Sequence, residues 1–167
     1  TSINPDKQPS GFPQFTSPAE YLKDIKDAGF DLLSTANNHT LDSEEKGIYD
    51  TMEAMDKEGM FIVPVNYGYE WEDIQVKNMK IGFLAYTYGV NGLESLVVNH
   101  KPNEIINYLD EKIIEEDIKE ARKNYELNNI TKKANQNLLL GYLATSCSYS
   151  NWLWNTTFVA FLINPPQ

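Results

Sequence analysis

The chain has 167 residues, enough for one domain with a substantial hydrophobic core. Asp and Glu number 24 against 14 Lys and Arg, and this formal net charge of -10 argues against non-specific binding to nucleic acid and against a polybasic membrane patch. The single cysteine, Cys147, excludes an internal disulfide and a zinc site built from several thiolates.

The N-terminal part of the chain shows one helix signal followed directly by one strand signal. Residues 1–16 are rich in Pro, Gly and polar side chains and indicate an extended leading segment. The segment Ser17-Pro18-Ala19-Glu20 predicts a helix start, because its serine can cap the helix and its glutamate can close a capping box. Gly29 fits the position just past the helix end, and the apolar run Phe30–Ala36 predicts a buried strand.

The same order then repeats. A second helix signal starts near Asp42 or Ser43 and stops at Gly59, and the run from Met60 to Val65 predicts another strand. This α-β-α-β order with short links favours a parallel sheet covered by helices. We therefore expect an α/β domain of layered sheet and helices.

The pattern changes after residue 70. The apolar segments 74–76 and 80–87 flank a short turn and predict a hairpin, whose second arm is apolar enough for a central strand. Residues 88–101 indicate a loop. Asp110 is a cap for a third helix, in which Ile113 or Ile114, Ile118 and Ala121 face inward.

The last part of the chain differs in composition from the rest. Residues 134–167 contain no Asp, Glu, Lys or Arg, and two strand-like runs at 138–140 and 158–163 predict a buried hairpin or a covered interface. Asn and Thr interrupt this tail, so no stretch reaches the roughly 18 apolar residues of a membrane span. We expect residues 1–133 to form the main domain, with the tail 134–167 packed on that domain or on an interface.

The most informative segment is the predicted strand exit, where Asn37, Asn38, His39 and Asp42 follow an apolar run. Open α/β sheets hold ligands at the carboxyl ends of their strands, so these polar side chains are candidates for a binding site. Turn chemistry is the competing interpretation, since Asn, His and Thr also cap loops and helices. Spacing alone leaves both interpretations open.

Other chemistries find weaker support in the sequence. Asn and His can ligate divalent metals, but these four residues supply only part of a shell. Glu44 and Glu45 fit the role of first-turn carboxylates that complement the helix dipole, and His100 fits a solvated loop residue. There is no Gly-x-Ser-x-Gly elbow and no Gly-rich phosphate loop.

Several blocks occur in an order that resembles a known family. They are Gly11-Phe12-Pro13-x-Phe15, Gly29-Phe30-Asp31, Ala36-Asn37-Asn38-His39-Thr40-Leu41-Asp42, Gly47-Ile48 and Lys80-Ile81-Gly82-Phe83-Leu84-Ala85-Tyr86-Thr87. Together they resemble the bacterial capsule-synthesis proteins of the CapA type, which are associated with poly-γ-glutamate. The resemblance spans roughly residues 11–123 and implies part of the calcineurin-like metallophosphoesterase fold.

The resemblance also implies roles for single residues. Asn38 matches a metal ligand, and His39 matches the residue that binds or protonates a phosphate-like group. Asn37 and Asp42 are possible additional polar residues of the same site. The implied cofactor is a divalent metal such as Mn or Zn in the full-length protein.

The chain also departs from the family pattern. Members carry an earlier strand ending in Gly-Asp and later His-Trp-Gly and His-Pro-His blocks, and this sequence has no histidine beyond His100. We therefore expect either an incomplete piece of a longer protein or a degenerate site, and no catalytic di-metal centre in this chain alone.

Three functional hypotheses follow. The first is a role in making, exporting or anchoring a surface polymer such as poly-γ-glutamate, with that anionic polymer or the membrane subunits of a capsule-synthesis complex as partners. By resemblance the location is the bacterial cell surface or membrane, although the chain shows no signal segment. The alternatives are a divalent-metal-dependent phosphoesterase and a non-enzymatic binding module that uses the aromatic segment Tyr67–Trp71 and the tail.

Overall fold

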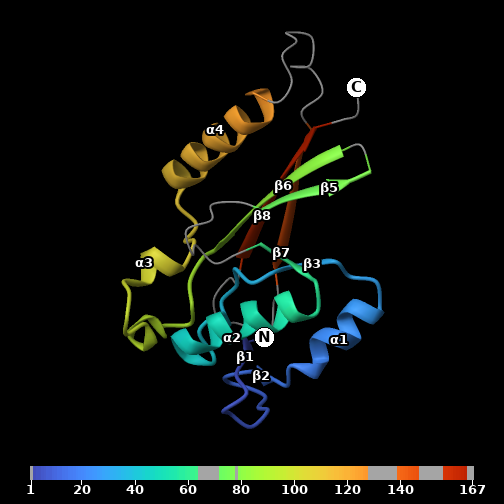
Figure 1. Cartoon of the computed structure of the whole chain (residues 1–167). Coiled ribbons are helices and arrows are strands. Elements are labelled where there is room, and N and C mark those ends of the chain that lie inside the picture. The colour runs from blue at the N-terminus through green and yellow to red at the C-terminus, as the bar shows by residue number, and fades with distance from the viewer. Residues whose placement is uncertain (1, 64–71, 78, 128–138, 147–155, 165–167) are drawn as a thin grey trace.

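The computed structural model describes residues 2–63, 72–77, 79–127, 139–146 and 156–164. The chain is mixed α/β, as expected, with two small parallel strand pairs at one end and a longer antiparallel sheet at the other (Figure 1). The aromatic segment Tyr67–Trp71, Cys147 and the expected domain boundary at residue 133 lie outside the described residues. No helix within the described ranges is both long and apolar enough to cross a bilayer.

The predicted α-β-α-β order is confirmed in the first half of the chain. The order is α1 (Glu20–Asp27), β3 (Leu32–Ser34), α2 (Glu44–Lys57) and β4 (Phe61–Val63). Strand β3 pairs in parallel with β4, and Leu33 lies opposite Ile62. Both glycine stops are confirmed, because Gly29 and Gly59 adopt positive φ just past the two helices.

Two local predictions in this half were wrong. The strand is shorter than Phe30–Ala36: β3 pairs with β4 at Leu32, Leu33 and Ser34, and the side chain of Phe30 is 58% exposed. Ser17 does not cap α1. It belongs to β2 (Thr16–Ser17), which pairs in parallel with β1 (Ser2–Ile3), and the helix begins after Ala19 without a side-chain cap.

The predicted hairpin is confirmed and forms part of a four-stranded sheet. Strand β5 (Glu72–Val76) pairs antiparallel with β6 (Met79–Thr87), which also pairs with β8 (Thr156–Asn164). Strand β7 (Leu139–Ser146) pairs with β8 and completes the order β5-β6-β8-β7. The two strands of the uncharged tail therefore extend the sheet that the charged part of the chain begins.

The predicted third helix is α4 (Glu111–Leu127), which lies beside this sheet (Figure 1). Asp110 caps it as expected, because its Oδ1 atom accepts hydrogen bonds from the backbone N–H groups of Lys112 and Ile113.

Helix α4 is bonded to the sheet through a side chain of β6. The buried Tyr86 hydroxyl of β6 donates to Asp117 Oδ2 at 2.6 Å. Burial raises the pKa of Asp117, and the hydrogen bond from Tyr86 opposes that rise. Ile113 is largely exposed, so Ile114 is the alternative that faces inward: Ile114 and Ile118 are half-buried, and Ala121 is fully buried.

The segment 88–101 is mainly loop, as expected, with a short 3-10 turn η1 (Glu94–Leu96), and the short helix α3 (Pro102–Ile105) follows it. The loop covers a hydrophobic cluster at the start of α2. That cluster contains Leu41, Ile48, Val90, Ile105 and Ile106, with Met52, Leu93, Val97 and Tyr108 packed against it.

Helix α2 lies very close to β1. Gly47 lies near the start of α2 at a position without room for a side chain, because a Cβ atom there would overlap the Cβ atom of Ser43, whereas Ile3 and Ser2 of β1 would lie at ordinary contact distance. Ser43 has little freedom to move, since its hydroxyl is buried and lies 2.8 Å from the hydroxyl of Thr16. One turn further along, Thr51 Oγ1 accepts the backbone N–H of Ile3 at 2.8 Å.

We expect Gly47→Ala to destabilise the protein by about 1–3 kcal/mol, because the added methyl group overlaps the buried side chain of Ser43. Helix propensity alone would favour alanine by up to about 1 kcal/mol, so the predicted sign is opposite to that of an open helical position. The urea unfolding midpoint measures the change. Gly11→Ala is the matched control, because nothing lies within 4 Å of a Cβ atom there. A Gly47→Ala midpoint equal to or above that of the parent chain would contradict the prediction.

Candidate functional site

The turn after β3 is held by Asn37, one of the polar residues that the sequence singled out, and by Thr40. Thr40 Oγ1 lies 2.6 Å from the carbonyl oxygens of both Thr35 and Asn37, which share its single O–H donor, and it accepts the N–H of Asn37. Asn37 Oδ1 accepts the backbone N–H of His39 at 2.9 Å. Turn chemistry therefore explains Asn37 and Thr40, and a binding role for Asn37 stays a prediction.

His39 and Asp42 form a carboxylate–imidazole pair just before α2. His39 Nδ1 lies 2.7 Å from Asp42 Oδ2, and the Asp42 side chain is completely buried while that of His39 is 28% exposed. The same carboxylate oxygen accepts the N–H of Phe15 at 2.7 Å. The Phe15 ring packs edge-on against the imidazole, with the two ring centroids 4.8 Å apart. A carboxylate oxygen accepts hydrogen bonds, so this geometry assigns the proton to Nδ1 and leaves Nε2 for chemistry.

Asn38 is hydrogen-bonded to Asn91, a residue that the sequence interpretation missed. Its Nδ2 atom donates to Asn91 Oδ1 at 3.2 Å, so the amide oxygen of Asn38 is the atom left to accept or to ligate. Asn91 Nδ2 lies 3.5 Å from His39 Nδ1, and because Nδ1 carries the proton that Asp42 accepts, this is a contact between two N–H groups and not a hydrogen bond. Three of the four predicted residues, Asn38, His39 and Asp42, are thus gathered, with Asn91 beside them.

A sequence signal for Asn91 was present in the Asn-Gly dipeptide at 91–92. Both residues adopt positive φ, 57° and 75°, and the N–H of Leu93 donates to the carbonyl of Val90. This is the geometry of a type I′ turn, for which Asn-Gly is the preferred pair. The dipeptide predicts a tight turn, but nothing local to it indicates that the turn faces residues 38 and 39.

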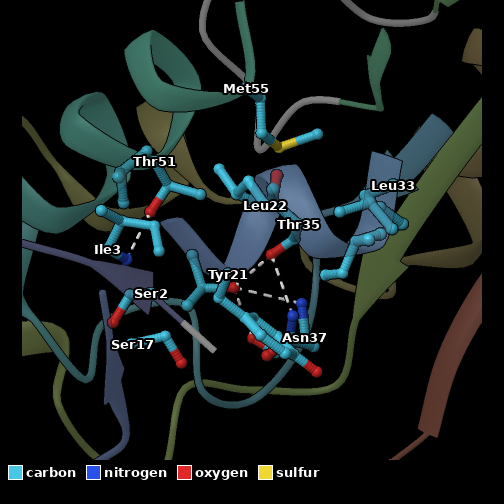
Figure 2. Close-up of a pocket in the computed structure, with 14 residues that line it drawn as sticks. Ser2, Ile3, Ser17, Tyr21, Leu22, Leu33, Thr35, Asn37, Thr51 and Met55 are labelled. Carbon is cyan, nitrogen blue, oxygen red and sulfur yellow. Dashed lines mark hydrogen bonds between the residues drawn. The ribbon is translucent and has the colours of Figure 1, made fainter. Parts of the chain in front are cut away.

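A cavity of about 200 Å³ lies on the other side of the same strand exit (Figure 2). Residues of β1, α1, β3 and α2 line it together with Asn37 and Thr40, whereas Asn38, His39 and Asp42 do not. None of its lining residues is charged, and its surface combines apolar side chains with hydroxyl groups. An anionic ligand would find no charged partner here, so the exposed imidazole of His39 is the better candidate for such a ligand.

A second carboxylate–imidazole pair corrects two expectations. His100 is not simply solvated, because its Nδ1 lies 2.6 Å from Glu45 Oε1. Glu45 does not merely complement the helix dipole: its side chain is buried, and its Oε2 atom accepts the N–H groups of Val98 and Asn99 at 2.7 and 2.8 Å. Burial alone would raise the pKa of Glu45, but the hydrogen bonds from Asn99, His100 and Val98 outweigh burial and lower it to about 2.

The described residues do not fit a closed metal site. No group of three or more His, Cys, Asp or Glu side chains in these ranges could hold an ion. Asp42 Oδ1 is a buried acceptor without a hydrogen-bond partner among the described residues, and it would suit a cation, but it would be the site's only carboxylate. The assignment of Asn38 to a metal therefore stays a prediction.

The lowered pKa of Glu45 predicts an acid-dependent loss of stability. Because ionised Glu45 is favoured in the folded state, it stabilises the fold above its ordinary pKa of 4.5, and this stabilisation is lost as pH falls toward 2. We expect Glu45→Gln to lower the free energy of unfolding at pH 7 by about 1–3 kcal/mol. The difference between the parent and Glu45→Gln should shrink between pH 4.5 and 2 in urea unfolding series.

Glu44→Gln is the control for this pH series, because Glu44 is exposed and pairs only with the surface residue Lys7 among the described residues. It should change stability by less than about 1 kcal/mol at any pH. A gap between the parent and Glu45→Gln that stays constant from pH 7 to 2 would contradict the assigned role of the Glu45 charge.

The comparisons with known proteins agree with the resemblance noted in the sequence. The family model described as bacterial capsule synthesis protein PGA_cap matches residues 1–130. Neither curated proteins nor solved structures gave a match. The family match covers most of the chain and includes both carboxylate–imidazole pairs. The chain therefore belongs to the PGA_cap family of bacterial capsule synthesis proteins.

Proposed function

We propose that this chain acts in capsule synthesis by contacting an anionic surface polymer such as poly-γ-glutamate through His39. The observation that supports the proposal most strongly is the His39–Asp42 pair, which directs Nδ1 inward and leaves Nε2 for a ligand. When the ring is protonated, Nε2 donates to a carboxylate of the polymer while Asp42 accepts from Nδ1. Asp42 and the N–H of Phe15 serve to orient the ring, and the Asn38 oxygen supplies a neighbouring acceptor.

The charge of the chain limits this interaction. A net charge of -10 repels a polyanion at long range, so recognition depends on short-range donors, on bridging cations or on a partner protein. The membrane subunits of a capsule-synthesis complex are the partner class that we propose. The family points to association with the cell surface, and we propose that the chain works there.

A binding experiment tests the role of His39. In calorimetric titration with poly-γ-glutamate at low salt, we expect His39→Gln to weaken binding about tenfold, the equivalent of one charge-assisted hydrogen bond. Asp42→Asn should weaken it in the same direction, because the ring loses its orienting acceptor. Lys112→Gln removes an exposed cation on α4 and is the control, which should leave the affinity nearly unchanged. Equal losses in His39→Gln and Lys112→Gln would indicate a diffuse charge effect and contradict the proposal.

A divalent-metal-dependent phosphoesterase is the second candidate, because His39 could assist P–O cleavage and Asp42 Oδ1 could face a cation. The described residues provide too few ligands for that chemistry. We therefore expect phosphodiesterase and phosphatase turnover with added Mn²⁺ or Zn²⁺ to stay at background. Turnover by the parent chain that disappears in His39→Ala would favour the phosphoesterase over the polymer-binding function.

The third hypothesis, a non-enzymatic binding module, depends on Tyr67–Trp71 and on the uncharged tail. The aromatic segment lies outside the described residues, so no contact in the structure argues for it. A change of Trp71 fluorescence on titration with poly-γ-glutamate without metal would favour this module over a contact at His39.

A further inference from the structure

The loop of residues 88–101 carries Asn91 to the candidate site and has two separate anchors. At one end, the side chain of Asn91 meets Asn38 and His39. At the other end, Glu45 binds residues 98–100. Both ends of the loop therefore contact the segment from Asn38 to Glu45.

The middle of the loop packs on this same segment. Val90, Leu93 and Val97 belong to the cluster around Leu41 and Ile48. Leu41 lies between His39 and Asp42 in the sequence, so the cluster on which the loop packs includes a residue of the segment that carries the imidazole pair. Backbone hydrogen bonds from Leu93 to Val90, from Leu96 to Leu93 and from Val97 to Glu94 connect the two ends as a chain of turns.

Beyond Val97 this packing ends. The side chain of Val98 is 77% exposed, and residues 98–100 belong to no hydrophobic cluster among the described residues. Polar contacts attach them to α2: the Glu45 carboxylate accepts two backbone N–H groups and lies 2.6 Å from the His100 imidazole, and the Tyr49 hydroxyl lies 3.4 Å from His100 Nδ1. A buried carboxylate with several charge-assisted hydrogen bonds is a strong local attachment. Tyr49 adds a longer contact of 3.4 Å to the same carboxylate.

We infer that Glu45 is a positioning residue for the His39 site: by fixing residues 98–100 it holds the 88–101 loop, and so keeps Asn91 against Asn38 and His39. Two carboxylates three residues apart thus have different roles. Asp42 orients the His39 imidazole, and Glu45 positions the side-chain amide of Asn91, which in turn orients Asn38. The relevance of this placement to ligand binding rests on the proposed polymer contact at His39, whereas the placement itself is a property of the fold.

The placement is tested by NMR without any ligand. The side-chain amide signals of Asn91 and Asn38 are recorded in ¹H–¹⁵N spectra of the parent chain, of Glu45→Gln and of Glu44→Gln. We expect Glu45→Gln to shift or broaden both amide signals and Glu44→Gln to leave them in place, since Glu44 bonds only to Lys7 among the described residues. Unchanged Asn91 and Asn38 signals in a folded Glu45→Gln variant would overturn the inference, because Glu45 would then hold residues 98–100 without affecting the position of Asn91.

A second variant covers the case in which Glu45→Gln does not fold. His100→Ala leaves the buried carboxylate and its two backbone donors intact and removes only the imidazole partner. It should produce smaller displacements of the same two amide signals. No displacement in His100→Ala would count against the inference.

A double-mutant cycle with poly-γ-glutamate tests the consequence for binding. We expect Asn91→Ala and Glu45→Gln each to weaken binding about fivefold, and the double variant to be no weaker than either single one, because both act through the same amide. Losses that multiply would contradict the coupling. If the parent chain does not bind the polymer, the proposed function fails, and the amide spectra still decide whether Glu45 positions Asn91.

Discussion

Two buried carboxylates at the start of α2 organise this part of the molecule. Asp42 and Glu45 are nearly inaccessible to solvent, and each lies within 2.7 Å of an imidazole nitrogen and accepts backbone N–H groups from a distant segment. Asp42 attaches the leading segment at Phe15, and Glu45 attaches the 88–101 loop. A buried charge without partners is strongly destabilising, so both segments must dock for the fold to form.

The close packing of α2 makes this arrangement possible. Gly47 leaves room for the Ser43 side chain, and the contact between the hydroxyls of Ser43 and Thr16 fixes the start of the helix, from which both carboxylates project. The partly exposed His39 ring is therefore held by a packed assembly. Preorganisation of this kind favours a side chain that binds a ligand through a single well-placed nitrogen.

Local sequence signals predicted the elements but not the contacts between them. Gly29, Gly59 and Asp110 marked helix ends correctly because capping and positive φ are decided within a few residues. The prediction that Ser17 caps α1 was wrong because Ser17 lies in β2, which pairs with β1. The residues around Ser17 do not indicate this pairing. Strand β3 pairs with β4, a partner 29 residues away in the register, and the local run Phe30–Ala36 does not indicate which of its residues will pair.

In the candidate site, too, the local residues could be predicted and the distant ones could not. Asn38, His39 and Asp42 could be predicted because they share one strand exit and because the surrounding block resembles the capsule-synthesis family. Asn91 and His100 could not, because each reaches the site across more than 50 residues of chain. The burial of Glu45 was equally hidden, since a glutamate in the first helical turn is usually solvated and the two N–H groups that bind it belong to a loop.

The central claim is that Asp42 fixes the His39 ring so that Nε2 serves an anionic polymer. Long-range ¹H–¹⁵N spectra of the His39 ring, recorded during addition of poly-γ-glutamate, test it most directly. The account predicts a ring that carries its proton on Nδ1 when neutral, and an Nε2 signal that moves on addition of the polymer. A neutral ring protonated on Nε2, or ring signals unmoved by a polymer that binds elsewhere, would contradict it.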